Sequence, residues 1–241
     1  MLMNKLLIAL AIAACSSAVM ADDKIDYSFG IRSWNHKFKE TVTTQSTSAS
    51  IVTATAKKGN YFVATSFLMP TTYSYGTAYI IRKDTDLAFG YSINPNISVL
   101  LGTKRISIDQ SSSTDSTMNA TYIGANGFTS LGEETFLFGQ LTRSINLKDS
   151  SIPAGYKVTY SSYEAGLGYV LNKNTQITGG YRTQIFDPSP SGTSTTLTGI
   201  IFGVTITAFT KRLKTLHLIY ITDDKRIYHS KEEALGTKSL F

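Results

Sequence analysis

Few side chains in this chain could do acid–base or nucleophilic chemistry. His36 has Ser33 and Glu40 close to it in the sequence, and these are residue types that hydrolytic sites use. In an extended segment, however, Ser33 and His36 point to opposite faces, because successive side chains alternate. We therefore predict that His36 is a solvated residue at the edge of a loop, and we assign no catalytic residue.

Metal and cofactor chemistry find no support in the composition. The 241 residues include 3 His and 1 Cys, which excludes an internal disulfide and a cysteine-based zinc cluster. No two histidines have the spacing of a metal-binding pair, and no glycine-rich phosphate loop opens a helix. The sequence thus predicts neither a cofactor nor a metal site.

Period-two alternation, broken by turn residues, runs through 22–209 and predicts strands. Ten strands are expected, near 25–38, 48–57, 60–69, 85–94, 97–108, 117–129, 135–147, 157–171, 175–186 and 196–209. The connections alternate between short turns and long Ser/Thr-rich loops, including one over 70–84, which is typical of an outer-membrane barrel. Since an open sheet edge is costly in hydrocarbon, we predict an all-β, closed antiparallel transmembrane β-barrel. The segment 73–81 reads as a loop, an extension of the third strand or a separate strand, so eight or twelve strands remain alternatives.

Two hairpins resemble each other closely. The segments 90–96 and 168–174 both begin with Gly-Tyr and end with Asn-x-Asn, at a constant offset of 78 residues. Each Asn-x-Asn predicts a tight reversal between two strands.

Pairing across these two turns predicts which charged residues face each other. Glu164 lies opposite Arg182, and Asp86 lies opposite Lys104. Both pairs fall on the strand face that carries Gly, Ser and Thr, whereas the other face is apolar. A membrane barrel turns its apolar face outward. These pairs, together with Arg32, are therefore predicted to occupy the lumen, where they either pin the wall or gate a pore.

The N-terminus has the pattern of a secretory signal peptide over 1–21. Lys5 gives a positive start, 6–14 is apolar, and Val19-Met20-Ala21 fits a cleavage site. In an alternative interpretation, the segment ending in Cys15 resembles a lipobox, and Cys15 would be lipidated. The barrel then covers 22–209, and 210–241 is a basic extension of uncertain structure.

The positive charge does not indicate a nucleic-acid partner. The net charge is +6, but 210–241 alone holds seven basic and four acidic residues. The barrel segment is close to neutral, so the charge is mostly a property of the C-terminal extension.

The hairpins at 90–96 and 168–174 resemble those of small bacterial outer-membrane β-barrel proteins, the OmpA/OmpX/Opa-like group. The resemblance covers roughly 22–209. It implies a place in the cell outer membrane, with membrane lipid and the barrel-assembly machinery as partners. Members include anchors, adhesins, small pores and a few enzymes, so the fold does not choose a function.

The chain departs from this group at its C-terminal end. Phe209 falls on the opposite strand face from its apolar neighbours, and the chain continues to Phe241. The segment 216–221 reads as a further strand or as part of a short periplasmic tail. A read-through or a frameshift at the end of the gene is a further alternative.

Aromatic residues mark two further candidate sites. Tyr91, Tyr169 and Tyr181 are predicted to form an interface girdle, whereas Tyr73, Tyr75 and Tyr79 are candidate loop contacts for an extracellular ligand. The function we expect is a structural or surface-interaction barrel with a mostly occluded lumen. The alternatives are a narrow pore for small solutes or ions and, third, a hydrolase at the rim of the barrel.

Overall fold

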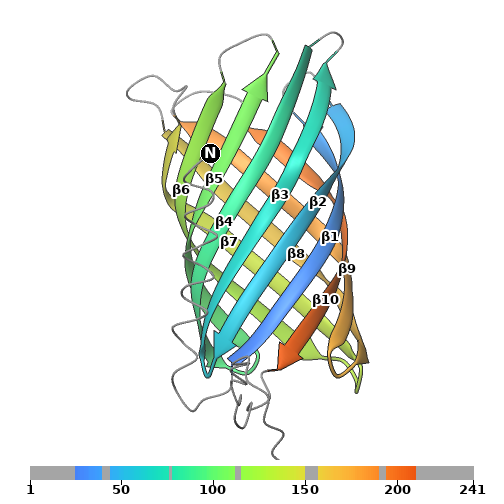
Figure 1. Cartoon of the computed structure of the whole chain (residues 1–241). Helices are drawn as coiled ribbons and strands as arrows, with labels where there is room; N and C mark the ends of the chain where they lie inside the picture. Colours follow the sequence, from blue (N-terminus) through green and yellow to red (C-terminus); the bar gives the residue numbers. More distant parts are fainter. Residues whose placement is uncertain are drawn as a thin grey trace, which may run out of the picture. The chain divides into compact units, whose positions relative to one another are not determined.

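The computed structural model describes residues 25–39, 44–75, 78–111, 115–149, 157–189 and 194–209. Ten strands in these residues form a closed antiparallel barrel, in which sequence neighbours pair and the first strand pairs with the last (Figure 1). The strands are β1 (Ile25–Lys39), β2 (Thr44–Lys58), β3 (Tyr61–Tyr75), β4 (Ala78–Asn94), β5 (Ile97–Gln110), β6 (Ser116–Ser130), β7 (Thr135–Asp149), β8 (Lys157–Asn172), β9 (Thr175–Ser189) and β10 (Thr195–Phe209). The predicted fold class is confirmed. No helix among these residues is long and apolar enough to cross a membrane.

The largest difference from the predicted strands lies between β3 and β4. The predicted loop over 70–84 is wrong, because both strands continue through it and pair as far as Tyr75 and Ala78. A register shift between Leu68 and Thr71 leaves Met69 and Pro70 opposite a single residue of β4. Pro70 has no N–H for the ladder, and a bulge is where a sheet accommodates proline. The structure thus confirms the alternative in which the third strand extends upward.

The two similar hairpins end in matching turns. The side-chain oxygen of Asn94 accepts hydrogen bonds from the backbone N–H groups of Asn96 and Ile97, both at 2.8 Å. In the second hairpin Asn172 accepts one from the N–H of Asn174 at 2.9 Å. These side chains satisfy backbone donors that the ladder leaves free at the reversal, which explains why Asn occurs twice at the same place.

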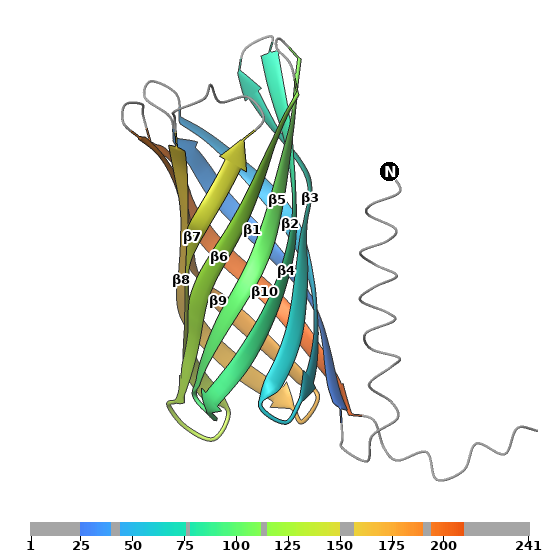
Figure 2. The ribbon, with the colours of Figure 1, turned by 90° about the vertical axis from the view of Figure 1, so that its left-hand side faces the viewer.

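The outer face of the wall is a belt of exposed apolar side chains. Phe29, Leu101, Leu167 and Phe202 are each more than half exposed and come from four different strands. A strand of 15 residues is roughly 50 Å long, so even a tilted strand spans the apolar band of about 25 Å. The tilt of the strands against the barrel axis is visible in Figure 2. This belt is the outward apolar face of a membrane-spanning barrel.

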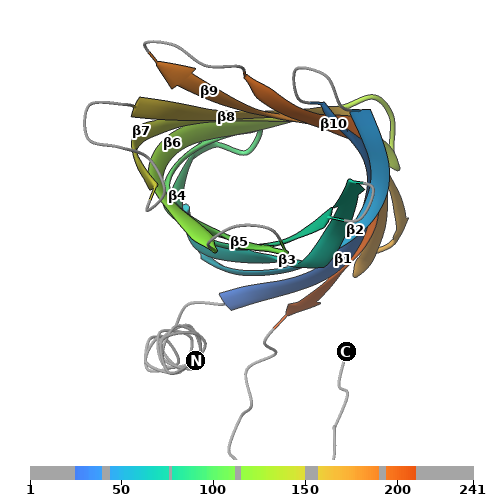
Figure 3. The same ribbon diagram turned by 90° about the horizontal axis from the view of Figure 1, so that it is seen from above.

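Seen from above, the wall forms a ring of strands (Figure 3). The interior side chains differ along the axis. Toward the long loops they form an apolar cluster, buried charges lie against it, and toward the short turns they line a cavity.

Several predictions concern residues outside the described ranges. These are the signal peptide over 1–21 with Cys15, the side chain of Phe209, and the extension 210–241 with its segment 216–221. The domain boundaries that follow from them stay predictions.

Candidate functional site in the lumen

The lumen is filled toward the long loops by a cluster that we call the apolar plug. Its buried members are Trp34, Ala49, Ile51, Leu68, Tyr73, Ile106, Tyr160, Phe186, Leu197 and Ile201. Trp34 and Ile201 have no exposed surface, and Leu197 and Ile106 have almost none. A tightly packed apolar cluster of this kind excludes water from the space that it fills. The sequence predicted a lumen occupied by charges and missed this plug, although Trp34, Ile106 and Tyr160 alternate in phase with the predicted inward residues Arg32, Lys104 and Glu164.

His36 belongs to this plug, and the prediction of a solvated residue is wrong. It is 2% exposed, and its ring stacks on that of Trp34 with centroids 4.0 Å apart. Its Nδ1 lies 3.0 Å from the carbonyl oxygen of Trp34, and its Nε2 lies 2.7 Å from the hydroxyl of Tyr73. A carbonyl only accepts, so Nδ1 carries the proton, and Nε2 accepts from Tyr73. His36 is buried because β1 turns its even-numbered side chains inward and Tyr73, on the extended part of β3, covers it.

The three tyrosines predicted as loop contacts do not form one surface. Tyr73 is 2% exposed and packs inside the barrel against His36 and Phe38. Tyr79 is 45% exposed, on β4. Tyr75 is the last residue of β3, and its side chain is outside the described set. The candidate contact at Tyr73 is therefore wrong, because the bulge in β3 turns this residue into the lumen.

A group of buried charges lies against the plug, with Asp84 opposite Leu68 and Ile106 in the ladders. Arg82 donates two hydrogen bonds to the carboxylate of Asp84, at 2.8 and 2.6 Å. Lys104 lies 3.2 Å from the same carboxylate and 3.3 Å from that of Asp86. The predicted register of Asp86 against Lys104 is the observed one. Each charge thus has an opposite charge within hydrogen-bond reach, as burial requires.

Gln184 joins this group to the plug. It is fully buried, accepts from Arg82 at 2.9 Å and donates to the Tyr160 hydroxyl at 3.1 Å. Arg82 and Asp84 were missed because 70–84 was read as a loop, whereas Gln184 lies on the predicted strand 175–186, on the same face as Arg182. The signal was present, since Arg82, Asp84 and Asp86 alternate on one face of an unbroken strand.

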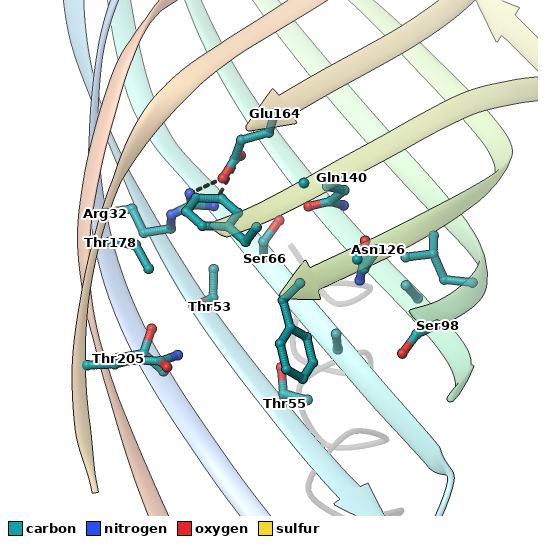
Figure 4. Close-up of a pocket in the computed structure, with 18 of the residues that line it drawn as sticks. Arg32, Thr53, Thr55, Ser66, Ser98, Asn126, Gln140, Glu164, Thr178 and Thr205 are labelled. Atoms are coloured by element: carbon teal, nitrogen blue, oxygen red, sulfur yellow. Dashed lines mark hydrogen bonds and ion pairs between the residues drawn. The ribbon is translucent and has the colours of Figure 1, made fainter. Parts of the chain in front are cut away.

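A second group of charges lies on the other side of the lumen. Glu164 faces Arg182 across β8 and β9, as the turn predicted. Its hydrogen bonds nevertheless come from Arg32 on β1, through both terminal nitrogens of the guanidinium (Figure 4). The Nε of Arg182 is 3.9 Å from Glu164, and its guanidinium lies 5.2 Å from the ring centre of Trp34. All five charged residues predicted for the lumen therefore face the interior. Asp86 and Lys104 belong to the first group of charges, and Arg32, Glu164 and Arg182 form the second.

A cavity of about 730 Å³ lies beneath the charges and reaches the short turns. Its upper lining includes Arg32, Glu164 and Arg182, and its lower lining includes Asn96 and Glu133. Between them the wall carries hydroxyl and amide groups, several of which are visible in Figure 4. The lumen thus holds a cup with a mixed polar and apolar lining, which includes the rings of Phe62 and Phe136, beneath the charges and the plug.

The aromatic girdle is only partly where it was predicted. Tyr91 and Tyr169 are about 40% exposed and lie near the short turns. The hydroxyl of Tyr169 donates to the Glu134 carboxylate, and Tyr91 packs against Tyr61 with ring centroids 5.1 Å apart. Tyr181 is exposed at the seventh position of β9, near the middle of the wall. Tyr181 therefore does not belong with the other two at the interface.

No metal site emerges from the described residues, where no group of three or more His, Cys, Asp or Glu side chains is placed to hold an ion. His36 contacts Trp34 and Tyr73, with no serine hydroxyl or carboxylate among its hydrogen-bond partners. The geometry of the part of the chain described here gives no support to a hydrolytic dyad at His36.

No protein-family model matches the chain, and no curated protein matches it. Solved structures similar to it include the outer-membrane protease OmpT of Escherichia coli, at 12% identity and a TM-score of 0.44, over 79% of this chain and 98% of that one. Neisserial surface protein A matches at 11% identity and a TM-score of 0.38, over 75% and 96%. Ail, the attachment invasion locus protein of Yersinia pestis, matches at 12% and 0.36, over 78% and 100%. No residue role is carried over from proteins this distant.

Proposed function

We propose that this chain is an integral outer-membrane β-barrel with a structural or surface-interaction role and an occluded lumen. One observation carries the proposal: the apolar plug places fully buried side chains inside the lumen, and paired charges lie beside it. A barrel that conducts solutes keeps a continuous polar path along its axis. Here that path is interrupted by side chains such as Trp34 and Ile201, which have no exposed surface.

The orientation follows from the lengths of the connections. Short turns face the periplasm in outer-membrane barrels, and long loops face outward. The cup then opens to the periplasm, and the Ser/Thr-rich loops cover the outer end. Export by the signal peptide over 1–21, insertion by the assembly machinery and contact with membrane lipid belong to the same proposal. The extracellular ligand of a surface interaction is not assigned.

A narrow pore is the second candidate. The cavity favours it, because about 730 Å³ of the lumen already lies open toward the short turns. For the barrel to conduct, the side chains of the plug and of the charge groups must move apart. For the lumen to stay closed, these side chains must keep their contacts.

Cysteine labelling tests location, orientation and closure together. In a Cys15→Ser background, Thr55→Cys places a thiol in the cup and Ser111→Cys places one beyond the end of β5. We expect a membrane-impermeant thiol reagent to label Ser111→Cys on intact cells. Thr55→Cys should be labelled only after the outer membrane is permeabilised. Equal labelling of both variants on intact cells would instead support the pore, and labelling of Thr55→Cys alone would reverse the orientation.

A further inference from the structure

Arg182 differs from the other cations of the lumen in its hydrogen bonds. Arg32, Arg82 and Lys104 each donate to a carboxylate. Within the described part of the chain, Arg182 donates to no acceptor, and its contact with Glu164 is 3.9 Å long. Its side chain is only 15% exposed, and its Nε is buried without a partner. A guanidinium is always charged and carries five donors, so shielding it without acceptors is unfavourable.

The charges around Arg182 leave a positive excess. In the described residues, the two charge groups around the cavity's upper end hold four cations, Arg32, Arg82, Lys104 and Arg182, against three carboxylates, Asp84, Asp86 and Glu164. Each carboxylate is already engaged: Asp84 by Arg82 and Lys104, Asp86 by Lys104 and Tyr122, and Glu164 by Arg32. One positive charge is therefore left over, and Arg182 is the group whose donors remain free to bind.

The cavity offers room beneath this cation and further hydrogen-bonding groups along its wall. Its volume of about 730 Å³ falls in the range of small-molecule sites. Its lining includes the hydroxyl groups of Thr53, Ser66, Thr178 and Thr205, which are visible in Figure 4. Hydroxyl groups donate to oxygen atoms, and a guanidinium fork matches two oxygens of one carboxylate or phosphate.

Two carboxylates at the mouth of the cavity, Glu133 and Glu134, would repel an anion that enters it. Both are exposed in the turn between β6 and β7. That turn lies about 20 Å along the wall from Arg182, by the rise of a strand. At physiological ionic strength the screening length is roughly 8 Å, so these charges act weakly at Arg182.

We propose that the cup is a binding site for a small organic oxyanion, a carboxylate or a phosphate, held by Arg182 and reached from the short-turn end. The proposal goes beyond the closure of the lumen, because it needs only the lower cavity. The oxyanion site would therefore remain possible even if the barrel were found to conduct.

Trp34 reports on this site. It is the only tryptophan in the sequence, and the guanidinium of Arg182 lies 5.2 Å from its ring centre. The experiment titrates the full chain, folded in maltoside micelles, with inorganic phosphate, acetate and chloride at constant ionic strength while tryptophan emission is recorded. We expect a saturable change with phosphate or acetate and none with chloride. A response to only one of the two oxyanions would support the proposal and identify the group recognised.

Two variants separate binding from a general charge effect. Arg182→Gln should weaken the saturable response at least tenfold, whereas Lys83→Gln should leave it unchanged, because Lys83 pairs with Asp109 on the exposed surface. If Arg182→Gln fails to fold, Arg182→Lys keeps the charge, loses the fork and should weaken the response severalfold. The proposal is overturned if the wild type gives no saturable change, if chloride acts as well as the oxyanions, or if a folded Arg182 variant responds like the wild type.

Discussion

Glu164 on β8 accepts hydrogen bonds from Arg32 on β1, although β9 and β10 lie between these strands in the wall. The contact therefore crosses the lumen instead of following the ladder. It links the first strand of the barrel to a strand in its last third, so it stabilises the closed form more than a pair on neighbouring strands would.

Glu164→Gln tests this link. The amide keeps the shape of the side chain but leaves Arg32 and Arg182 without a negative charge beside them. We expect the free energy of unfolding to fall by about 1–3 kcal/mol, less than for a fully buried pair because the Arg32 side chain is 17% exposed. Urea unfolding of the folded barrel measures the change.

The matched control is Asp109→Asn, which breaks the exposed pair with Lys83, where the side chains are 42% and 49% exposed. Exposed pairs of this kind contribute roughly 0.2–1 kcal/mol. Equal losses in the two variants would contradict the stabilising role of the link across the lumen.

Gly168→Ala tests a close approach inside the cup. The ring of Phe136 lies directly over the Cα of Gly168, where a Cβ would collide with it, and Phe62 lies over Gly90 in the same way. We expect Gly168→Ala to lower the free energy of unfolding by about 1–3 kcal/mol, the usual cost of overpacking. Adding Phe136→Leu should recover part of the loss.

Gly139→Ala serves as its control, because a Cβ there would meet its nearest neighbour at an ordinary 3.7 Å. If both glycine variants unfold at the same urea concentration, the contact with Phe136 does not restrict position 168.

Leu141→Arg tests the apolar belt. Leu141 is 48% exposed at the seventh position of β7, and a charge there would enter the middle of the bilayer. We expect a loss of about 2–4 kcal/mol in lipid. Ile177→Arg, close to the short turn between β8 and β9, should cost roughly 0–1 kcal/mol. Reversible unfolding from bilayers measures both, and a larger loss at Ile177 would mean that the membrane covers a different part of the wall.

Tyr73→Phe tests the hydrogen bond inside the plug. The change removes the hydroxyl that donates to His36, and a buried nitrogen without a partner costs about 1–3 kcal/mol. Combining it with His36→Phe removes both polar groups, so the double variant should lose less stability than the sum of the single changes. Additive losses in urea unfolding would show that the two side chains do not act on each other.

Much of the wall could be predicted from the sequence. Alternation has a period of two in every strand, and a turn such as 172–174 fixes the register for a whole hairpin. The opposition of Glu164 and Arg182 follows from that turn alone. The same rule failed at Pro70, where a loop was predicted over 70–84. The bulge there keeps the strand paired but shifts the inward and outward alternation of its side chains by one residue.

The contents of the lumen could be predicted only in part. The inward position of Arg32 follows from alternation, but its partner Glu164 lies three strands away in the ring. Local pairing rules do not reach across a closed barrel. For the same reason His36 was taken for a rim residue, although the extended hairpin of β3 and β4 covers it with Tyr73.

Planar-bilayer recording tests the central claim most directly. The full chain is first shown to be folded, because without heating it stays folded in dodecyl sulfate and migrates differently from the heated protein on a gel. It is then inserted into a planar bilayer, and the current is recorded under an applied voltage. A closed lumen predicts no current steps above the bare membrane. Discrete and reproducible steps from the folded wild type would contradict the seal formed by the plug and the buried charges, and would make the chain a pore.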